Sequence, residues 1–113
     1  MKYIIAVIQP DRLETVVDAL GEKGINLMTV SEVLGRGRQR GVSEVYRNHV
    51  QPGSLLRKIK VEIGVQDHRL QDALDAITLG AYTGNIGDGK IFVLDLEECI
   101  RIRTAEQGDV AIA

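Results

Sequence analysis

The sequence predicts an α+β fold in which a four-stranded antiparallel sheet carries two helices on one face. Three observations lead to this class: the chain has 113 residues, it divides into two similar halves, and each half predicts a strand, a helix and a strand. This is the ferredoxin-like plan, βαββαβ. A chain of this length supports one compact domain, so residues 1–113 are expected to form a single unit. The uncovered face of the sheet needs a partner, and a second copy of the chain is the simplest one.

The first half opens with a short apolar run. Residues 2–8 are rich in β-branched side chains and too short for a helix, so they predict a buried strand. Pro10 and Asp11 then open a segment in which apolar residues recur at helical spacing: Leu13, Val16, Val17 and Leu20. Gly24 marks the expected end of this helix. Residues 27–35 alternate loosely and predict a second strand.

The second half repeats this order. Residues 58–65 alternate with a period of two, as in a strand with one solvated face, and residues 89–95 predict the last strand. Between them, helical spacing recurs at Leu70, Ala73, Leu74 and Ile77. At an offset of 57 positions, Gln9 and Arg12 recur as Gln66 and Arg69. Chance agreement between two amphipathic helices is the alternative, but amphipathicity requires neither a glutamine nor an arginine there, so we favour a duplication.

Between the halves, residues 36–57 sustain neither period. The stretch 36–60 carries seven basic residues and one acidic residue, so its charge is +6, while the net charge of −2 leaves −8 for the rest. An irregular loop this long is usually functional, although a solvated basic loop is the alternative. Three glycines favour the functional interpretation, because they let backbone amides approach an anion closely: Gly35, Gly37 and Gly41.

A second glycine cluster occupies residues 83–90. The stretch from Gly84 to Lys90 fits the spacing of a Walker loop, but Ile91 stands where such a loop needs Ser or Thr, and a strand follows instead of a helix. The cluster therefore predicts either a plain turn or an anion-binding nest of backbone amides. Residues 101–104 alternate, which predicts that their two arginines share one strand face and can clamp phosphate, with surface ion pairs as the alternative.

Composition argues against several classes of protein. No run of about 20 apolar residues exists, so we expect no membrane insertion. A single cysteine, Cys99, excludes an internal disulfide and fits a reducing, cytoplasmic setting. Four aromatic residues are too few for base stacking on a sheet, so we expect no nucleic-acid partner. His49 and His68 are far apart and no general base is apparent, so we expect a non-enzyme; a slow ATP-hydrolysing enzyme is the alternative of a different class.

The chain resembles the PII nitrogen-regulatory signalling family nearly from end to end, and three stretches carry the resemblance: residues 35–47, 83–93 and 101–104. The resemblance implies a ferredoxin-like homotrimer with nucleotide sites in the three clefts between subunits. It also implies three functional loops: a T-loop at about 37–55 that meets the partner, a B-loop at about 83–90, and a C-loop at about 101–109 from the neighbouring subunit.

The resemblance further implies that the site binds ATP or ADP. Around the phosphates we expect Gly37, Arg38, Gly87, Asp88, Gly89, Lys90, Arg101 and Arg103. Thr29 and Glu62 would lie near the adenine. Gln39 would hold Mg²⁺ together with ATP and 2-oxoglutarate, Gly41 would belong to the same 2-oxoglutarate site, and Lys58 would pair with the 2-oxoglutarate carboxylate. Ligand binding would then order the T-loop and change its affinity for a target protein.

For the target, Tyr46 and Arg47 are the expected contacts, and Arg47 matches the family residue that plugs ammonium channels. We therefore expect a cytoplasmic, non-catalytic sensor of ATP or ADP and 2-oxoglutarate that regulates an ammonium transporter or an enzyme of nitrogen metabolism. Gln51 and His49 stand where some members carry a uridylylated tyrosine or a phosphorylated serine, so neither modification is expected at these sites.

Two other departures bear on the ligands. Gln9 replaces a lysine that is common near the 2-oxoglutarate site, and Ala105 replaces a glycine of the C-loop. The alternative is therefore a PII-like paralogue that senses adenine nucleotides plus another metabolite, such as bicarbonate. Such a paralogue would regulate a different transporter or a target in carbon metabolism.

Overall fold

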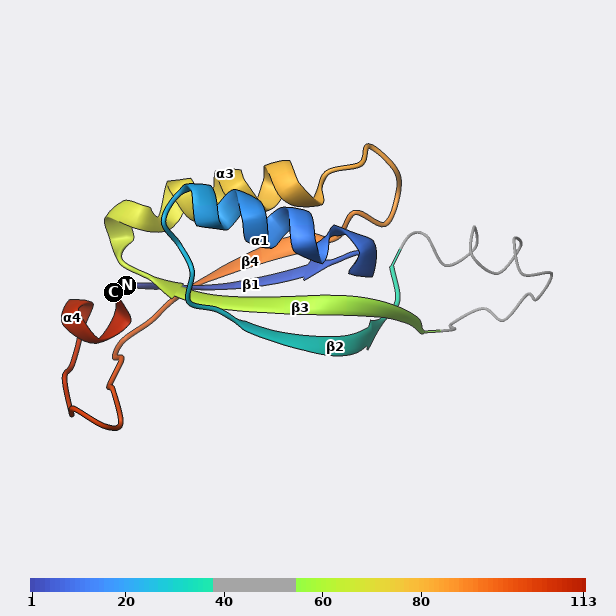
Figure 1. Cartoon of the computed structure of the whole chain (residues 1–113). Helices are drawn as coiled ribbons and strands as arrows, with labels where there is room; N and C mark the ends of the chain where they lie inside the picture. The colour runs from blue at the N-terminus through green and yellow to red at the C-terminus, as the bar shows by residue number, and fades with distance from the viewer. Residues whose placement is uncertain (38–54) are drawn as a thin grey trace.

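The computed structural model describes residues 1–37 and 55–113, and its elements follow the predicted order (Figure 1). They are β1 (Lys2–Ile8), the 3-10 turn η1 (Pro10–Arg12), α1 (Leu13–Glu22), β2 (Thr29–Gly35), β3 (Leu56–Val65), the 3-10 turn η2 (Asp67–Arg69), α3 (Leu70–Ala81), β4 (Lys90–Asp95) and α4 (Asp109–Ile112). The strands form one antiparallel sheet in the order β2-β3-β1-β4. Helices α1 and α3 cover one of its faces (Figure 1), so the predicted ferredoxin-like class is confirmed.

The predicted boundaries agree with the observed ones to within two residues, and β3 shows where the difference arises. This strand begins at Leu56 rather than at Lys58 because it continues to pair with β2, where Gly35 stands opposite Leu56. An ion pair of 3.0 Å between Arg57 and Glu32 lies on the same extension. Pairing with a neighbouring strand, rather than the local pattern, therefore sets the start of β3.

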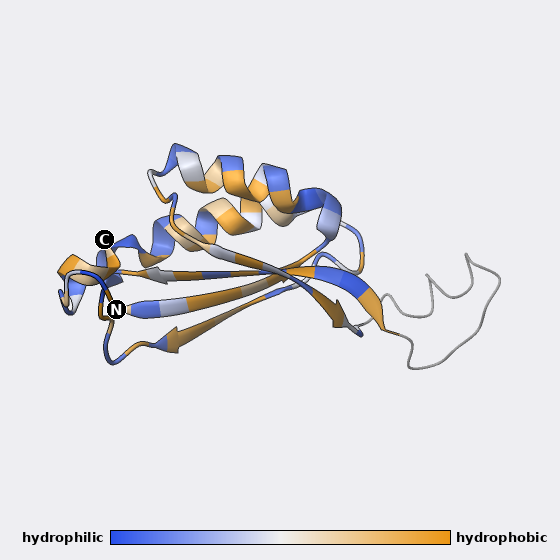
Figure 2. Ribbon diagram, turned by 60° about the horizontal axis from the view of Figure 1, so that its bottom comes forward, coloured by the Kyte–Doolittle hydropathy of each residue, from blue (hydrophilic) through white to orange (hydrophobic). Residues whose placement is uncertain are grey.

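The core lies between the sheet and the two helices. Alternate side chains of β1 and β3 are buried under the helices: Ile4, Ala6, Ile8, Ile59, Val61, Ile63 and Val65. The helices turn their apolar stripes toward them (Figure 2). Gly80 lets α3 approach α1 closely, because a Cβ atom at this position would lie 2.7 Å from the Cα atom of Val16.

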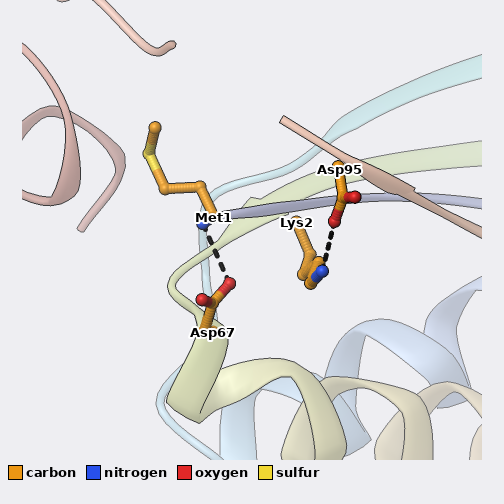
Figure 3. Close-up of polar contacts among 4 residues, drawn as sticks. All are labelled: Met1, Lys2, Asp67 and Asp95. Atoms are coloured by element: carbon orange, nitrogen blue, oxygen red, sulfur yellow. Dashed lines mark hydrogen bonds and ion pairs between the residues drawn. The ribbon is translucent and has the colours of Figure 1, made fainter. Parts of the chain in front are cut away.

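Two ion pairs stabilise the start of β1. The amino group of Met1 lies 2.9 Å from the Asp67 carboxylate at η2, and the Lys2 ammonium pairs with Asp95 at the end of β4 (Figure 3). The Met1 amino group lowers the pKa of Asp67, and Asp95 raises the pKa of Lys2. This end of the sheet is therefore held by charges from three segments that are distant in sequence.

The structure supports the predicted duplication. Ile5 pairs with Glu62, which is its own counterpart 57 positions later, so a pseudo-twofold axis passes between β1 and β3 at this pair. The duplicated arginines exchange equivalent contacts across this axis. The Arg12 Nε atom donates to the Gly80 carbonyl over 2.9 Å, and Arg69 donates to the carbonyl of Lys23, the counterpart of Gly80.

The two halves differ after the helix. Thr29 pairs with Glu62 and Phe92 pairs with Ile5, so Phe92 is the counterpart of Thr29 at an offset of 63 rather than 57. The second half therefore has six extra residues between the shared part of the helix and the last strand. They lengthen α3 and the connection 82–89, which contains the predicted B-loop. In the described part of the chain, no helix has the length and apolar character of a membrane span.

Candidate functional site

The described site residues fall into two groups at opposite ends of the sheet. Lys58, at the start of β3, and the B-loop lie at one end, where Val7 of β1 pairs with Lys90 of β4. Arg101 follows β4 and contacts α4 at the other end of the sheet, and Arg103 stands two residues further along the chain. Figure 1 shows α4 at the end of the sheet away from the B-loop. Thr29 and Glu62 pair with one another between these two ends.

Asp88 ties the B-loop together from within. Its carboxylate accepts hydrogen bonds from the backbone amides of Thr83 at 2.7 Å and Gly84 at 3.0 Å, and also from the Thr83 hydroxyl. The hydrogen bond from the Thr83 hydroxyl is the main reason that the pKa of Asp88 is lowered. The Asp88 carboxylate, which we expected near the phosphates, therefore makes these hydrogen bonds within the B-loop itself and stabilises the loop.

Glycine is required where the B-loop meets β1. Gly89 has a φ of 104°, and a Cβ atom there would lie 1.8 Å from the carbonyl oxygen of Val7. Gly84 and Gly87 also have positive φ angles, of 90° and 107°. The predicted glycine-rich turn is therefore confirmed, and its backbone lies directly against the end of β1.

Lys58 is a buried cation beside this loop. Its side chain points to the face of the sheet opposite the helices, and the residue is only 7 % exposed. The ammonium donates to the Gln9 side-chain oxygen at 3.2 Å and to the Gly87 carbonyl at 3.3 Å. Burial lowers the pKa of Lys58. Both of these acceptors are neutral oxygens, and an ammonium group can bind a carboxylate through charge-assisted hydrogen bonds.

Glu62 lies on the same open face. Its carboxylate accepts from the Tyr3 hydroxyl and lies 3.3 Å from the Lys60 ammonium. The hydrogen bond to Glu62 raises the pKa of Tyr3 to about 12, and the same bond lowers the pKa of Glu62. Next to Thr29, an ionised Glu62 can accept a hydrogen bond from an amino group. Sequence reasoning missed Tyr3, because no local pattern indicates a partner 59 positions away.

The strand predicted at residues 101–104 is wrong. Ile100 forms an isolated bridge with Gln107, and the chain turns between them. The turn closes through Ala105, whose amide donates to the Arg101 carbonyl at 2.8 Å and whose φ of 62° lies in the left-handed region. A turn with its own backbone hydrogen bonds replaces the sheet partner that a strand would need.

Arg101 makes a contact that its alternating position did not predict. Its Nε atom donates to the Ala111 carbonyl at 3.0 Å, and its Nη2 atom donates to the Ala113 backbone oxygen at 2.8 Å. The guanidinium thereby caps the end of α4. Arg103 is exposed.

Several predicted site residues lie outside the described residues: Arg38, Gln39, Gly41, Tyr46 and Arg47. Gly37, at the edge of the first described range, is exposed. Within residues 1–37 and 55–113, no group of three His, Cys, Asp or Glu side chains could hold a metal ion. Because Gln39 lies outside the described residues, its expected contact with Mg²⁺ stays a prediction.

Comparison with known proteins identifies the family. The model of the family "Nitrogen regulatory protein P-II" matches residues 1–106. The chain is 50% identical over 112 residues to nitrogen regulatory protein P-II 1 of Escherichia coli, a match that covers 99% of this chain and 100% of the relative. It is 44% identical to GlnK of the same species, with the same coverage.

An archaeal relative and a plant structure agree with this assignment. Nitrogen regulatory protein P-II 2 of Methanothermobacter thermautotrophicus is 47% identical, over 99% of this chain and 97% of the relative. The crystal structure of Arabidopsis thaliana PII bound to citrate superposes with a TM-score of 0.81 at 35% identity, over 98% of this chain and 88% of that chain. The chain belongs to the nitrogen regulatory protein P-II family.

Proposed function

We propose that this protein is a non-catalytic, cytoplasmic sensor that binds ATP or ADP together with 2-oxoglutarate. Through residues 37–55 it regulates a target of nitrogen metabolism, such as an ammonium transporter or an enzyme, with Tyr46 and Arg47 as contacts. The observation that carries the proposal is the buried Lys58 ammonium bonded to the Gly87 carbonyl of the B-loop. This contact lets a bound carboxylate and a bound nucleotide act on one another.

The shape of the B-loop supports the nucleotide part of the proposal. Gly87 and Gly89 have positive φ angles and no side chains to cover their backbone, and Lys90 follows at once. Exposed backbone amides and an adjacent ammonium are the usual means of holding phosphate. Gln39 would offer an amide oxygen to Mg²⁺, which prefers oxygen ligands and is commonly shared with phosphates.

The separation of the site residues supports a homotrimer. From Lys58 to Gly64 the strand β3 spans six residues, or about 20 Å, and Ile112 of α4 packs at Gly64. Arg101 and Arg103 therefore lie far from the B-loop of their own chain. In the proposed trimer, they would reach the phosphates bound to the B-loop of a neighbouring subunit, and the apolar side chains of the open sheet face, such as Phe92, would be covered.

The chemistry of Lys58 supports a carboxylate as the second signal, as does the structural relative that binds citrate. Gln9 gives weight to a second candidate, because a neutral amide rather than another cation stands beside Lys58. The positive charge of Lys58 also suits a small monoanion such as bicarbonate. In that case the protein would regulate a different transporter or a target in carbon metabolism.

Isothermal titration calorimetry tests the proposal. Wild-type protein is expected to bind ATP, and then to bind 2-oxoglutarate when Mg²⁺ and ATP are present. Replacing Lys90 by Ala should weaken ATP binding at least about tenfold, the effect of losing one hydrogen-bonded charge contact with phosphate. Arg57→Ala is the matched control, since Arg57 makes a surface ion pair with Glu32.

Three outcomes would contradict parts of the proposal. Failure of the wild type to bind ATP would remove the nucleotide role. Heat from bicarbonate but not from 2-oxoglutarate would select the alternative metabolite. Sustained ATP hydrolysis that falls in Lys90→Ala would show that the protein is an enzyme.

A further inference from the structure

Helix α4 is docked on the sheet at the end away from the B-loop (Figure 1). Its Ile112 packs at Gly64 of β3, where a Cβ atom would lie 2.9 Å from the Ile112 Cδ1 atom. Ala111 is only 6 % exposed. The Gln66 side chain, just after β3, donates to the Asp109 carbonyl at 3.1 Å. Apolar packing and a hydrogen bond therefore both hold this short helix against the end of β3.

The backbone at Arg101 is held as well. Its amide donates to the Glu106 carbonyl at 2.9 Å, and its carbonyl accepts the Ala105 amide at 2.8 Å. At the base of the same turn, the Gly108 amide donates to the Cys99 carbonyl at 2.9 Å. The Arg101 side chain therefore starts from a closed turn whose backbone is hydrogen-bonded on both sides.

The Arg101 guanidinium joins this turn to α4. Its Nε atom donates to the Ala111 carbonyl at 3.0 Å, and its Nη2 atom donates to the Ala113 backbone oxygen at 2.8 Å. Nε and Nη2 form the side edge of the planar group, whereas Nη1 and the other hydrogen of Nη2 form its end edge. Helix α4 therefore engages the side edge, and a phosphate can bind to the end edge without breaking these contacts.

This arrangement distinguishes Arg101 from Arg103. Arg103 stands two residues further along the chain and is exposed. A long side chain that is free in solution loses rotamer freedom when it binds a ligand, and this loss weakens binding. Arg101 has already lost much of that freedom to its contacts with α4. Its affinity for phosphate should therefore depend on whether α4 stays docked.

We propose that α4 is a positioning element for the nucleotide site: its last carbonyls hold the side edge of the Arg101 guanidinium, so that the end edge is presented to the phosphates. This inference rests on the proposed function, in which Arg101 contacts the phosphates of a nucleotide bound between two subunits. It gives Ala111 a role in nucleotide affinity that acts through Arg101 and needs no contact with the nucleotide.

The variant that tests the inference is Ala111→Gln. Glutamine is larger than alanine and polar, so burying it at position 111 is unfavourable and α4 should lift from the sheet. It adds no charge that could pair with Arg101. Val110→Gln is the matched control, because it places the same side chain on the same helix at a position that is 62 % exposed.

ATP binding to each protein is measured by isothermal titration calorimetry. Ala111→Gln is expected to weaken it by about threefold to tenfold, because the arginine must then be ordered at the moment of binding. Val110→Gln should stay within about twofold of the wild type. In the Arg101→Ala background, adding Ala111→Gln should change the affinity by less than about twofold, because the residue through which α4 acts is gone.

The contact itself is followed by NMR of the Arg101 Nε–H group in proteins without nucleotide. The signal is assigned by its absence from Arg101→Ala. The hydrogen bond to the Ala111 carbonyl should slow exchange of this proton with water in the wild type and in Val110→Gln. Exchange should be about tenfold faster, or more, in Ala111→Gln.

The outcomes separate the inference from the proposed function. If the wild type does not bind ATP, the proposed nucleotide role fails and the inference fails with it. If the wild type and Ala111→Gln bind ATP equally, the inference alone is overturned. An equal loss of affinity with and without Arg101 would overturn it too, because α4 would then act on the fold in general. Equal Nε–H exchange in the wild type and Ala111→Gln would show that α4 does not hold the guanidinium, and would also overturn the inference.

Discussion

Glu62, on the open face of the sheet, is oriented by two neighbouring side chains. The Tyr3 hydroxyl and the Lys60 ammonium both approach its carboxylate. These contacts favour the ionised form of Glu62 and the protonated form of Tyr3. The carboxylate is therefore held as an acceptor in one orientation, as selective recognition of an adenine amino group would require.

Replacing Tyr3 by Phe should lower stability in a pH-dependent way. The pKa of Tyr3 is raised to about 12, so its contribution is fully present below pH ~10 and is lost as the pH rises through about 12. The pKa of Glu62 is lowered, so its contribution is present above pH ~4.5 and is lost as the pH falls below that value.

Urea unfolding of the two proteins from pH 3 to pH 12 measures this effect. The stability difference between wild type and Tyr3→Phe should be largest between roughly pH 5 and pH 10. Tyr82→Phe is the control, since Tyr82 is an exposed tyrosine. A difference that does not change with pH would contradict the hydrogen bond between Tyr3 and Glu62.

At the scale of elements, the two helices meet through a glycine. At Gly80 of α3, a Cβ atom would lie 2.7 Å from the Val16 Cα atom and 3.0 Å from the Thr15 carbonyl oxygen, both backbone atoms of α1. At Gly21 of α1, a Cβ atom would lie 3.6 Å from the Asn26 side-chain oxygen, which is ordinary contact. Replacing glycine by alanine should therefore lower the stability of the protein at position 80 and raise it at position 21.

Gly80→Ala is expected to destabilise the protein by about 1–3 kcal/mol, because α3 must move away from α1. Gly21→Ala should stabilise it by about 0.5–1 kcal/mol, the usual gain when alanine replaces glycine within a helix. Urea unfolding at matched protein concentration measures both changes. A stabilising Gly80→Ala would show that the helices do not pack as closely as described.

The sequence predicted most of the elements because their signals are local. Apolar runs, alternation and helical spacing identified the strands and both long helices of the described residues. Gly24, with a φ of 76°, follows the end of α1 as predicted. The same kind of signal failed at residues 101–104. There, alternation suggested a strand, but among the described residues the segment pairs with no neighbouring strand and turns back to Gln107 instead.

At the scale of the whole molecule, the duplication places similar elements at the two ends of one sheet. The longer connection of the second half places the B-loop at one end of the sheet, whereas α4 and its Arg101 cap occupy the other end. The proposed phosphate contacts of Lys90 and Arg103 therefore belong to opposite ends of the sheet. A nucleotide that uses both must bridge two copies.

Mixed oligomers test this arrangement. Lys90→Ala and Arg103→Ala proteins should each bind ATP at least about tenfold more weakly than the wild type. When the two variants are assembled together, a cleft between an intact Lys90 and an intact Arg103 should regain wild-type affinity.

Calorimetry of the mixture measures the recovery, and sedimentation velocity checks that the species is a trimer. Each variant alone is the control. If the mixture shows no recovery, Lys90 and Arg103 do not act on one nucleotide from two subunits.

Local patterns in the amino-acid sequence specify the fold class, the two halves, the glycine-rich connection after α3 and the resemblance to the PII family. These features depend on periodicity and on residue types that are close together along the chain. Only the tertiary structure decided that Lys58 is buried, that Gln9 and Gly87 accept its hydrogen bonds, and that Arg101 caps α4. Burial and hydrogen-bond partners arise when strands distant in sequence come together, so no local pattern contains them.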